Sequence, residues 1–133
     1  MSAMPMPTAL QDGIHAFNRG AYFECHEILE ALWLATDDTE ARAFYQGLIQ
    51  LAVACYKLTT QPNFVGARNK LRKALVNLTP LCGHSPWSQW IDLDQLVKDS
   101  RSLETQLLRL GAAGFHTLDP RTIPTVTQPA SNT

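Results

Sequence analysis

The chain has 133 residues, of which 45% are hydrophobic, and this is enough for one domain with a real core. Its 11 basic and 12 acidic residues give a formal net charge of −1, so we expect neither a nucleic-acid surface nor a polybasic membrane patch. The longest apolar stretch, residues 47–56, is too short to cross a bilayer. The N-terminus carries no positive segment followed by an apolar one, so we expect a cytoplasmic protein.

Hydrophobic periodicity predicts five helices, at residues 9–18, 21–35, 40–58, 64–78 and 93–110. Residues 1–7 are predicted to be a loose leader, and the Pro/Thr-rich residues 111–133 a C-terminal tail that is either draped on the surface or disordered. No segment alternates like a strand. We therefore predict an all-α fold, a single bundle of about five helices over residues 8–110.

Short loops between the second, third and fourth helices predict antiparallel helical hairpins. The third helix is the most apolar and is predicted to be the buried centre. It contains Gly47, which costs about 1 kcal/mol relative to alanine inside a helix. We therefore expect a neighbouring helix to approach closely at that residue. The three cysteines lack C-x-x-C spacing and are expected to be reduced.

One motif with possible chemistry lies in the second helix, the run H-x-x-x-E-x-x-W of His26, Glu30 and Trp33. Residues four and seven apart return to the same helix face, so these side chains should lie together, beside Tyr22. Burying an ionisable group without a partner costs several kcal/mol. This stripe of side chains on the second helix must therefore line a cleft or have internal partners.

The third helix offers such partners, because Gln46 and Gln50 are four residues apart in an otherwise apolar run. A glutamine in a buried helix usually has a hydrogen-bond partner. Antiparallel packing would bring both residues against the stripe. We therefore predict one polar cluster inside the bundle, formed by His26, Glu30, Gln46 and Gln50.

The run H-E-I-L-E-A-L-W, with N-R-G-A-Y-F-E before it and F-Y-Q-G-L-I-Q-L-A-V-A-C-Y after it, resembles the uncharacterised prokaryotic family catalogued as domain of unknown function 309. The resemblance covers roughly residues 14–78. It implies a small helical domain without an established activity. It also implies a metal-binding role for the motif, which is carried here by His26, Glu30 and Trp33.

The residues themselves leave several chemistries open. Histidine and carboxylate are good ligands for a divalent metal such as zinc, manganese or iron, but His26 and Glu30 are only two ligands. The nearest additional ones are His15, Glu24 and Glu27, and Glu27 points about 100° away on the helix. The pair could instead be a general base with its orienting carboxylate, or a structural hydrogen-bonded pair.

The alternative function is a protein-interaction module in which the motif only fixes helix packing. The spacing G-x-Y-x-x-C from Gly20 resembles the second helix of a tetratricopeptide repeat, although the period of that repeat is absent. A groove lined by Tyr22, Trp33, Phe44 and Tyr45 could hold a partner helix, unless these aromatic residues belong to the core.

Two further groups of side chains leave the partner open, whether a second copy of this chain or another protein. Trp87 and Trp90 could cap the bundle or lie at an interface. The basic residues Arg68, Lys70, Arg72 and Lys73 are typical of a solvated face, but Arg68 and Arg72 could also pair with acidic groups on the second helix.

Overall fold

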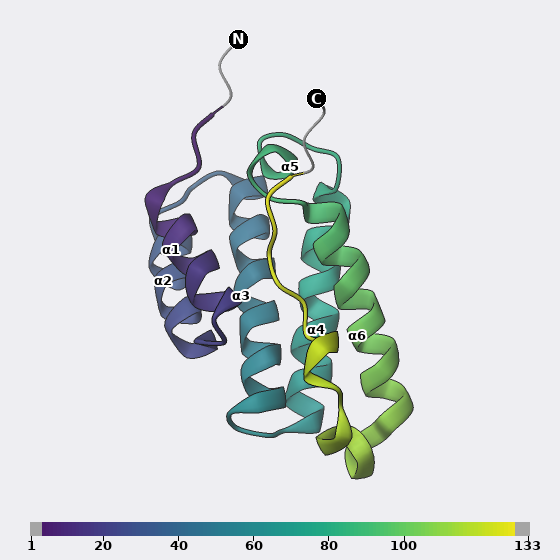
Figure 1. Cartoon of the computed structure of the whole chain (residues 1–133). Helices are drawn as coiled ribbons and strands as arrows, with labels where there is room; N and C mark the ends of the chain where they lie inside the picture. The colour runs from purple at the N-terminus through teal and green to yellow at the C-terminus, as the bar shows by residue number, and fades with distance from the viewer. Residues whose placement is uncertain (1–3, 130–133) are drawn as a thin grey trace.

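The computed structural model describes residues 4–129 and confirms the all-α prediction, since no strand occurs within them. The five long helices are α1 (Thr8–Asn18), α2 (Tyr22–Leu34), α3 (Thr39–Thr59), α4 (Phe64–Leu78) and α6 (Leu93–Gly114). A four-residue helix, α5 (Trp87–Trp90), lies between α4 and α6, and three 3₁₀ turns follow α4 and α6 at Thr79–Leu81, Phe115–Thr117 and Pro120–Thr122. Figure 1 shows these elements in chain order.

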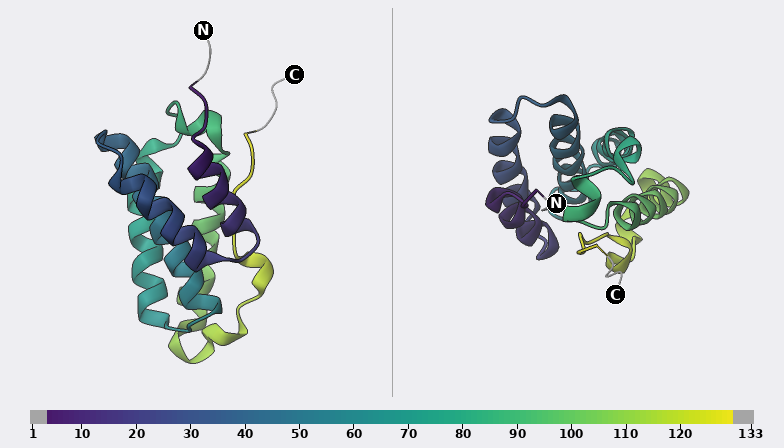
Figure 2. Two further views of the ribbon diagram at one scale, coloured as in Figure 1. Left: turned by 90° about the vertical axis from the view of Figure 1, so that its left-hand side faces the viewer. Right: turned by 90° about the horizontal axis from the view of Figure 1, so that it is seen from above.

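Successive long helices pack against each other, α1 on α2, α2 on α3, α3 on α4 and α4 on α6. Seen from above in Figure 2, they follow one another around an arc. The last described residues lie between the two ends of this arc, α1 and α6. Helix α3 has buried residues along its whole length and forms the centre of the core, as predicted. No helix within residues 4–129 has both the length and the apolar character needed to cross a membrane.

Capping side chains fix where α3 and α4 begin. The carboxylate of Asp38 accepts a 2.9 Å hydrogen bond from the backbone N–H of Ala41, and Asn63 Oδ1 accepts one of 2.9 Å from Gly66 N–H. Both caps satisfy amides that a helix start leaves without partners. The short connections before these caps make α2, α3 and α4 antiparallel neighbours.

The close approach predicted at Gly47 is confirmed. A Cβ atom at this position would lie 2.6 Å from Leu78 Cγ and 3.2 Å from Asn77 Cβ, both on α4. Only glycine leaves room for α4 here. This contact sets how deeply α4 packs on α3, and it brings Asn77 next to the side chains of α3.

The two tryptophans cap the bundle. Trp87 and Trp90 are 4% and 7% exposed, and the Trp87 ring stacks on Phe44 with a centroid separation of 4.9 Å. The indole N–H of Trp87 donates to Glu40 at 3.2 Å, and that of Trp90 donates to the Met4 carbonyl at 2.7 Å. A short helix with two buried rings therefore lies in the segment that sequence reasoning left irregular, because proline and glycine obscured its periodicity.

The C-terminal segment is draped over the helices as far as it is described. Asn18 at the end of α1 donates to the Val126 carbonyl and accepts from the Val126 N–H, both at 2.8 Å. The Val126 side chain is buried. Helix α6 runs to Gly114 rather than 110, but its geometry is interrupted at Gly111, where φ is 69°. The leader is described from Met4 onward, and its first three residues lie outside the described range.

Candidate functional site

A pocket of about 430 Å³ opens between α2 and α3. We call it the α2–α3 pocket. All six side chains singled out in the sequence line it, namely Tyr22, His26, Glu30, Trp33, Gln46 and Gln50. The other lining residues are Phe23, Ile49, Val53, Tyr56, Lys57 and Lys70. Half of the twelve lining residues are thus apolar or aromatic, and the other half are polar or charged.

The motif pair lies at the mouth of this pocket. His26 Nε2 is 3.0 Å from Glu30 Oε2, and the two side chains are 30% and 50% exposed. The pair follows directly from the i, i+4 spacing on α2. The stripe therefore lines a cleft, and Glu30 faces solvent instead of lying inside the bundle.

The glutamines are arranged differently from the predicted cluster. Gln50 is only 7% exposed, and its Oε1 accepts a 2.8 Å hydrogen bond from Asn77 Nδ2 on α4. The partner of Gln50 is therefore neither His26 nor Glu30. Sequence reasoning missed Asn77 because its contact with α3 depends on the depth of the Gly47 approach, which no local pattern encodes.

The Trp33 wall is held in place by Arg42 at the start of α3. The Arg42 guanidinium carbon lies 4.0 Å from the centre of the indole, a cation–π contact. Its Nη1 also donates to the carbonyls of Trp33 and Thr36 at 3.0 and 2.9 Å. These bonds satisfy carbonyls at the C-terminal end of α2 and fix the Trp33 end of the pocket.

Phe44 and Tyr45 do not belong to this groove, which is the second of the two alternatives that the sequence left open for them. They are 0% and 4% exposed and belong to the core, where Phe44 stacks on Trp87. The groove instead has Phe23 and Tyr56 at its other end, with ring centroids 6.0 Å apart. Tyr56 and Lys57 continue the Gln46–Gln50–Val53 face of α3, so extending that periodicity would have found them.

Within residues 4–129, Arg68 and Arg72 of the basic run do not form the ion pairs with α2 that the sequence left open as an alternative. Arg72 pairs with Glu104 on α6 and not with an acidic group on α2. Arg68 lies over the Phe64 ring on its own helix, at 5.7 Å. Lys70 is the member of the run that reaches the α2–α3 pocket.

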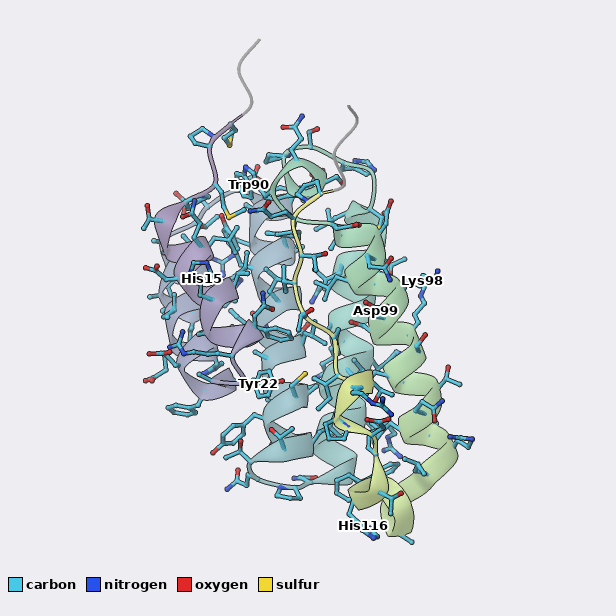
Figure 3. All side chains as sticks on the ribbon, viewed as in Figure 1. His15, Tyr22, Trp90, Lys98, Asp99 and His116 are labelled. Atoms are coloured by element: carbon cyan, nitrogen blue, oxygen red, sulfur yellow. The ribbon has the colours of Figure 1, made fainter. Side chains whose placement is uncertain are left out.

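The residues present do not complete a metal site. No group of three or more His, Cys, Asp or Glu side chains suited to a metal occurs in residues 4–129. Glu24 pairs with Arg19, and Glu27 is exposed and does not line the pocket. His15 lies on α1 in a different hollow beside Trp90 (Figure 3). A metal here would have only His26 and Glu30 as protein ligands, in a pocket that also contains two lysines.

Burial raises the pKa values of three groups on α2 and α3. It raises the pKa of Tyr22 and of the Cys25 thiol to about 12, and it raises that of Cys55 as well. All three groups are therefore protonated at neutral pH and are inert as nucleophiles. The described cysteines are free thiols, as expected.

Fold and pocket together define a class, a small all-α bundle with a polar, aromatic-walled pocket built on an H-x-x-x-E-x-x-W helix. Residues 10–69 match the family model described as "Domain of unknown function (DUF309)". The predicted resemblance to this family is confirmed over these residues, which include all of α2 and α3. Lys70 lies just beyond the match.

Two curated relatives are similar to part of the chain. "Uncharacterized protein YpuF" of Bacillus subtilis (strain 168) is 41% identical over 54 residues, which are 41% of this chain and 30% of that protein. An "Uncharacterized protein" of Aquifex aeolicus (strain VF5) is 30% identical over 69 residues, 52% of this chain and 20% of that protein. The chain thus spans less than a third of either relative. No solved structure matches it.

Proposed function

We propose that the α2–α3 pocket is a binding site for a small organic molecule. The observation that carries this proposal is the joint lining of one pocket of about 430 Å³ by every motif side chain. Small-molecule sites commonly measure about 300–1,000 Å³ and combine apolar walls with a few convergent polar groups. The pocket lies within this size range and combines six apolar or aromatic lining residues with six polar or charged ones.

The polar groups are arranged to orient a ligand. His26 and Glu30 offer a hydrogen-bonding pair at the mouth. Gln50 is held by Asn77 through its Oε1 atom, so its amide orientation is fixed before any ligand arrives. Pre-positioned groups of this kind reduce the entropy lost on binding.

A divalent metal at His26 and Glu30, either zinc, manganese or iron, is the second candidate. It is supported by the 3.0 Å approach of the two potential ligand atoms. Because two protein ligands are too few for a tight site, the remaining positions would have to come from water or from the bound molecule. The ammonium groups of Lys57 and Lys70 oppose a cation in the same pocket.

The interaction-module alternative assigns the motif only a packing role. The exposure of His26 and Glu30 speaks against it, because half-exposed ion pairs contribute little to stability. Its proposed groove also loses Phe44 and Tyr45 to the core. Of the four aromatic residues that this alternative places in the groove, Tyr22 and Trp33 line the pocket.

The test is a fragment screen read by backbone amide shifts in ¹H–¹⁵N NMR spectra. We expect fragments to shift α2 and α3 signals in the wild type and not in Val53→Phe, which fills the pocket. Val76→Phe is the matched control, because Val76 is 62% exposed on α4 and lies outside the pocket. Absence of pocket shifts in the wild type, or equal shifts in Val53→Phe that is folded by circular dichroism, would contradict the proposal.

Elemental analysis of untagged protein purified without chelator tests the metal. Stoichiometric metal that is lost in His26→Ala would support the second candidate. A metal-free protein whose melting temperature is unchanged by zinc, manganese or iron would overturn it.

A further inference from the structure

We infer that the ligand of the α2–α3 pocket is an organic anion, with a single carboxylate-like group held by Lys57 and Lys70 and a flat apolar body against the aromatic walls. This inference rests on the proposed function and names its ligand class. It depends on the placement of the two lysines, their lack of partners and the lining around them.

The two lysines reach the pocket from different helices, Lys57 from α3 and Lys70 from α4. Both are half-buried. Within residues 4–129, neither ammonium lies within 4.0 Å of a carboxylate. Two half-buried lysines from different helices, without a carboxylate partner in the described residues, therefore line one pocket.

The stem of Lys57 is packed against α4. A Cβ atom at Gly66 would lie 2.7 Å from Lys57 Cδ and 3.1 Å from its Cε. The absence of a side chain at Gly66 therefore gives the lysine stem its place. A stem fixed in this way loses less rotamer entropy when its ammonium binds a ligand.

The charges of the pocket favour an anion although the chain as a whole carries −1. Its lining contains two lysines and one glutamate, and that glutamate is already engaged by His26 at 3.0 Å. A pocket lined mainly by charges of one sign concentrates ligands of the opposite sign. A cationic ligand would face both ammonium groups.

The remaining lining residues favour a ligand whose body is flat and apolar. Ile49 and Val53 give the pocket an apolar base, and Phe23 and Tyr56 form an aromatic pair at one end. Phe23 is 56% exposed, so its ring keeps apolar surface in contact with water at the pocket. A flat ring between these walls would remove this apolar surface from water.

The experiment compares three probes that share one ring and differ in charge, namely indole-3-acetate, indole-3-acetamide and tryptamine. Their dissociation constants are measured by NMR titration of the wild-type protein, following α2 and α3 amides. We expect the acetate to bind about tenfold more tightly than the neutral amide, because a hydrogen bond to a charged group contributes more than one between neutral groups. Tryptamine should bind most weakly.

The variant Lys57→Met with Lys70→Met retains both apolar stems and removes the charges. It should bind acetate and amide equally, with the amide constant unchanged from the wild type. Lys73→Met is the matched control, since Lys73 is exposed on α4 one turn after Lys70 and does not line the pocket. It should leave all three constants unchanged.

Equal affinity for the three probes, preference for tryptamine, or an equal loss in Lys73→Met would overturn the inference. If the acetate shifts no pocket signal while neutral or cationic fragments do, the organic-anion inference fails and the proposed function remains. If no fragment of any charge shifts the pocket, both fail.

Discussion

Asn77 on α4 donates a 2.8 Å hydrogen bond to Oε1 of Gln50 on α3, at the base of the α2–α3 pocket. The two residues are 27 positions apart in the chain. Gln50 is buried, and Asn77 is half-buried. The bond therefore compensates an amide that would otherwise lose water on folding.

Asn77→Ala should lower the free energy of unfolding by about 1–3 kcal/mol, because it leaves the buried Gln50 carbonyl without a donor. Urea denaturation measures the change. Asn69→Ala, at an exposed position of the same helix, should change it by less than about 0.5 kcal/mol. Equal effects of the two substitutions would mean that the Asn77–Gln50 bond contributes nothing specific.

Glu30→Gln should lower the free energy of unfolding by less than about 1 kcal/mol, because its bond with His26 is half-exposed. The same urea titration measures it, with Glu104→Gln as the comparison, since Glu104 is 12% exposed and pairs with Arg72. Glu104→Gln should cost more. A loss of several kcal/mol in Glu30→Gln would show that the motif is a structural device.

Gly47→Ala should destabilise the fold by about 1–3 kcal/mol even though alanine is the better helix former. Its new methyl group would meet Leu78 at 2.6 Å. Gly114→Ala is the control, because the nearest atom to its Cβ would be Leu110 Cβ at an ordinary 3.7 Å. Thermal unfolding of both variants checks the prediction, and a Gly47→Ala protein as stable as the wild type would refute the close packing of α3 on α4.

Asn18→Ala should release the C-terminal segment from α1, because it removes both hydrogen bonds to Val126. Trypsin should then cut after the exposed Arg121 faster than in the wild type. Cleavage after Arg101, in the middle of α6, is the internal control and should keep its rate. An unchanged rate at Arg121 would mean that other contacts hold the segment.

Alkaline pH should destabilise the protein from about pH 9 upward. Burial raises the pKa of Cys25 from 9.0 to about 12, and it raises that of Cys55 too. The unfolded thiols therefore lose protons first, so stability is complete below pH 9 and falls as the pH rises toward the folded-state pKa. Each such thiol contributes a slope of up to about 1.4 kcal/mol per pH unit.

The measurement is the urea midpoint at several pH values between 8 and 11. Cys25→Ala should be less stable at neutral pH because it leaves a small cavity, but its stability should fall less steeply with pH. The slope of stability against pH reports the titration of the thiol, whereas the stability at neutral pH reports the loss of packing. Parallel curves for Cys25→Ala and the wild type would contradict the assigned cause.

The sequence by itself determined the helices and the motif stripe. Apolar residues at helical spacing, the caps before α3 and α4, and the i, i+4 relation of His26 to Glu30 are all local. Local spacing fixes backbone conformation and the face on which a side chain lies. The close helix approach at Gly47 was also predicted from the sequence, because a glycine inside an apolar helix is unfavourable unless a neighbouring helix needs the space.

Only the tertiary structure decided which distant side chains meet. The pairing of Gln50 with Asn77, the presence of Lys57 and Lys70 in one pocket lining, and the stacking of Phe44 on Trp87 depend on the rotation and depth of one helix against another. The hydrophobic period of a helix does not determine its rotation or its packing depth against a neighbour. These are determined by the packing of the whole core. The motif was therefore visible in the sequence, whereas the charges and walls that define its pocket were assembled by the fold.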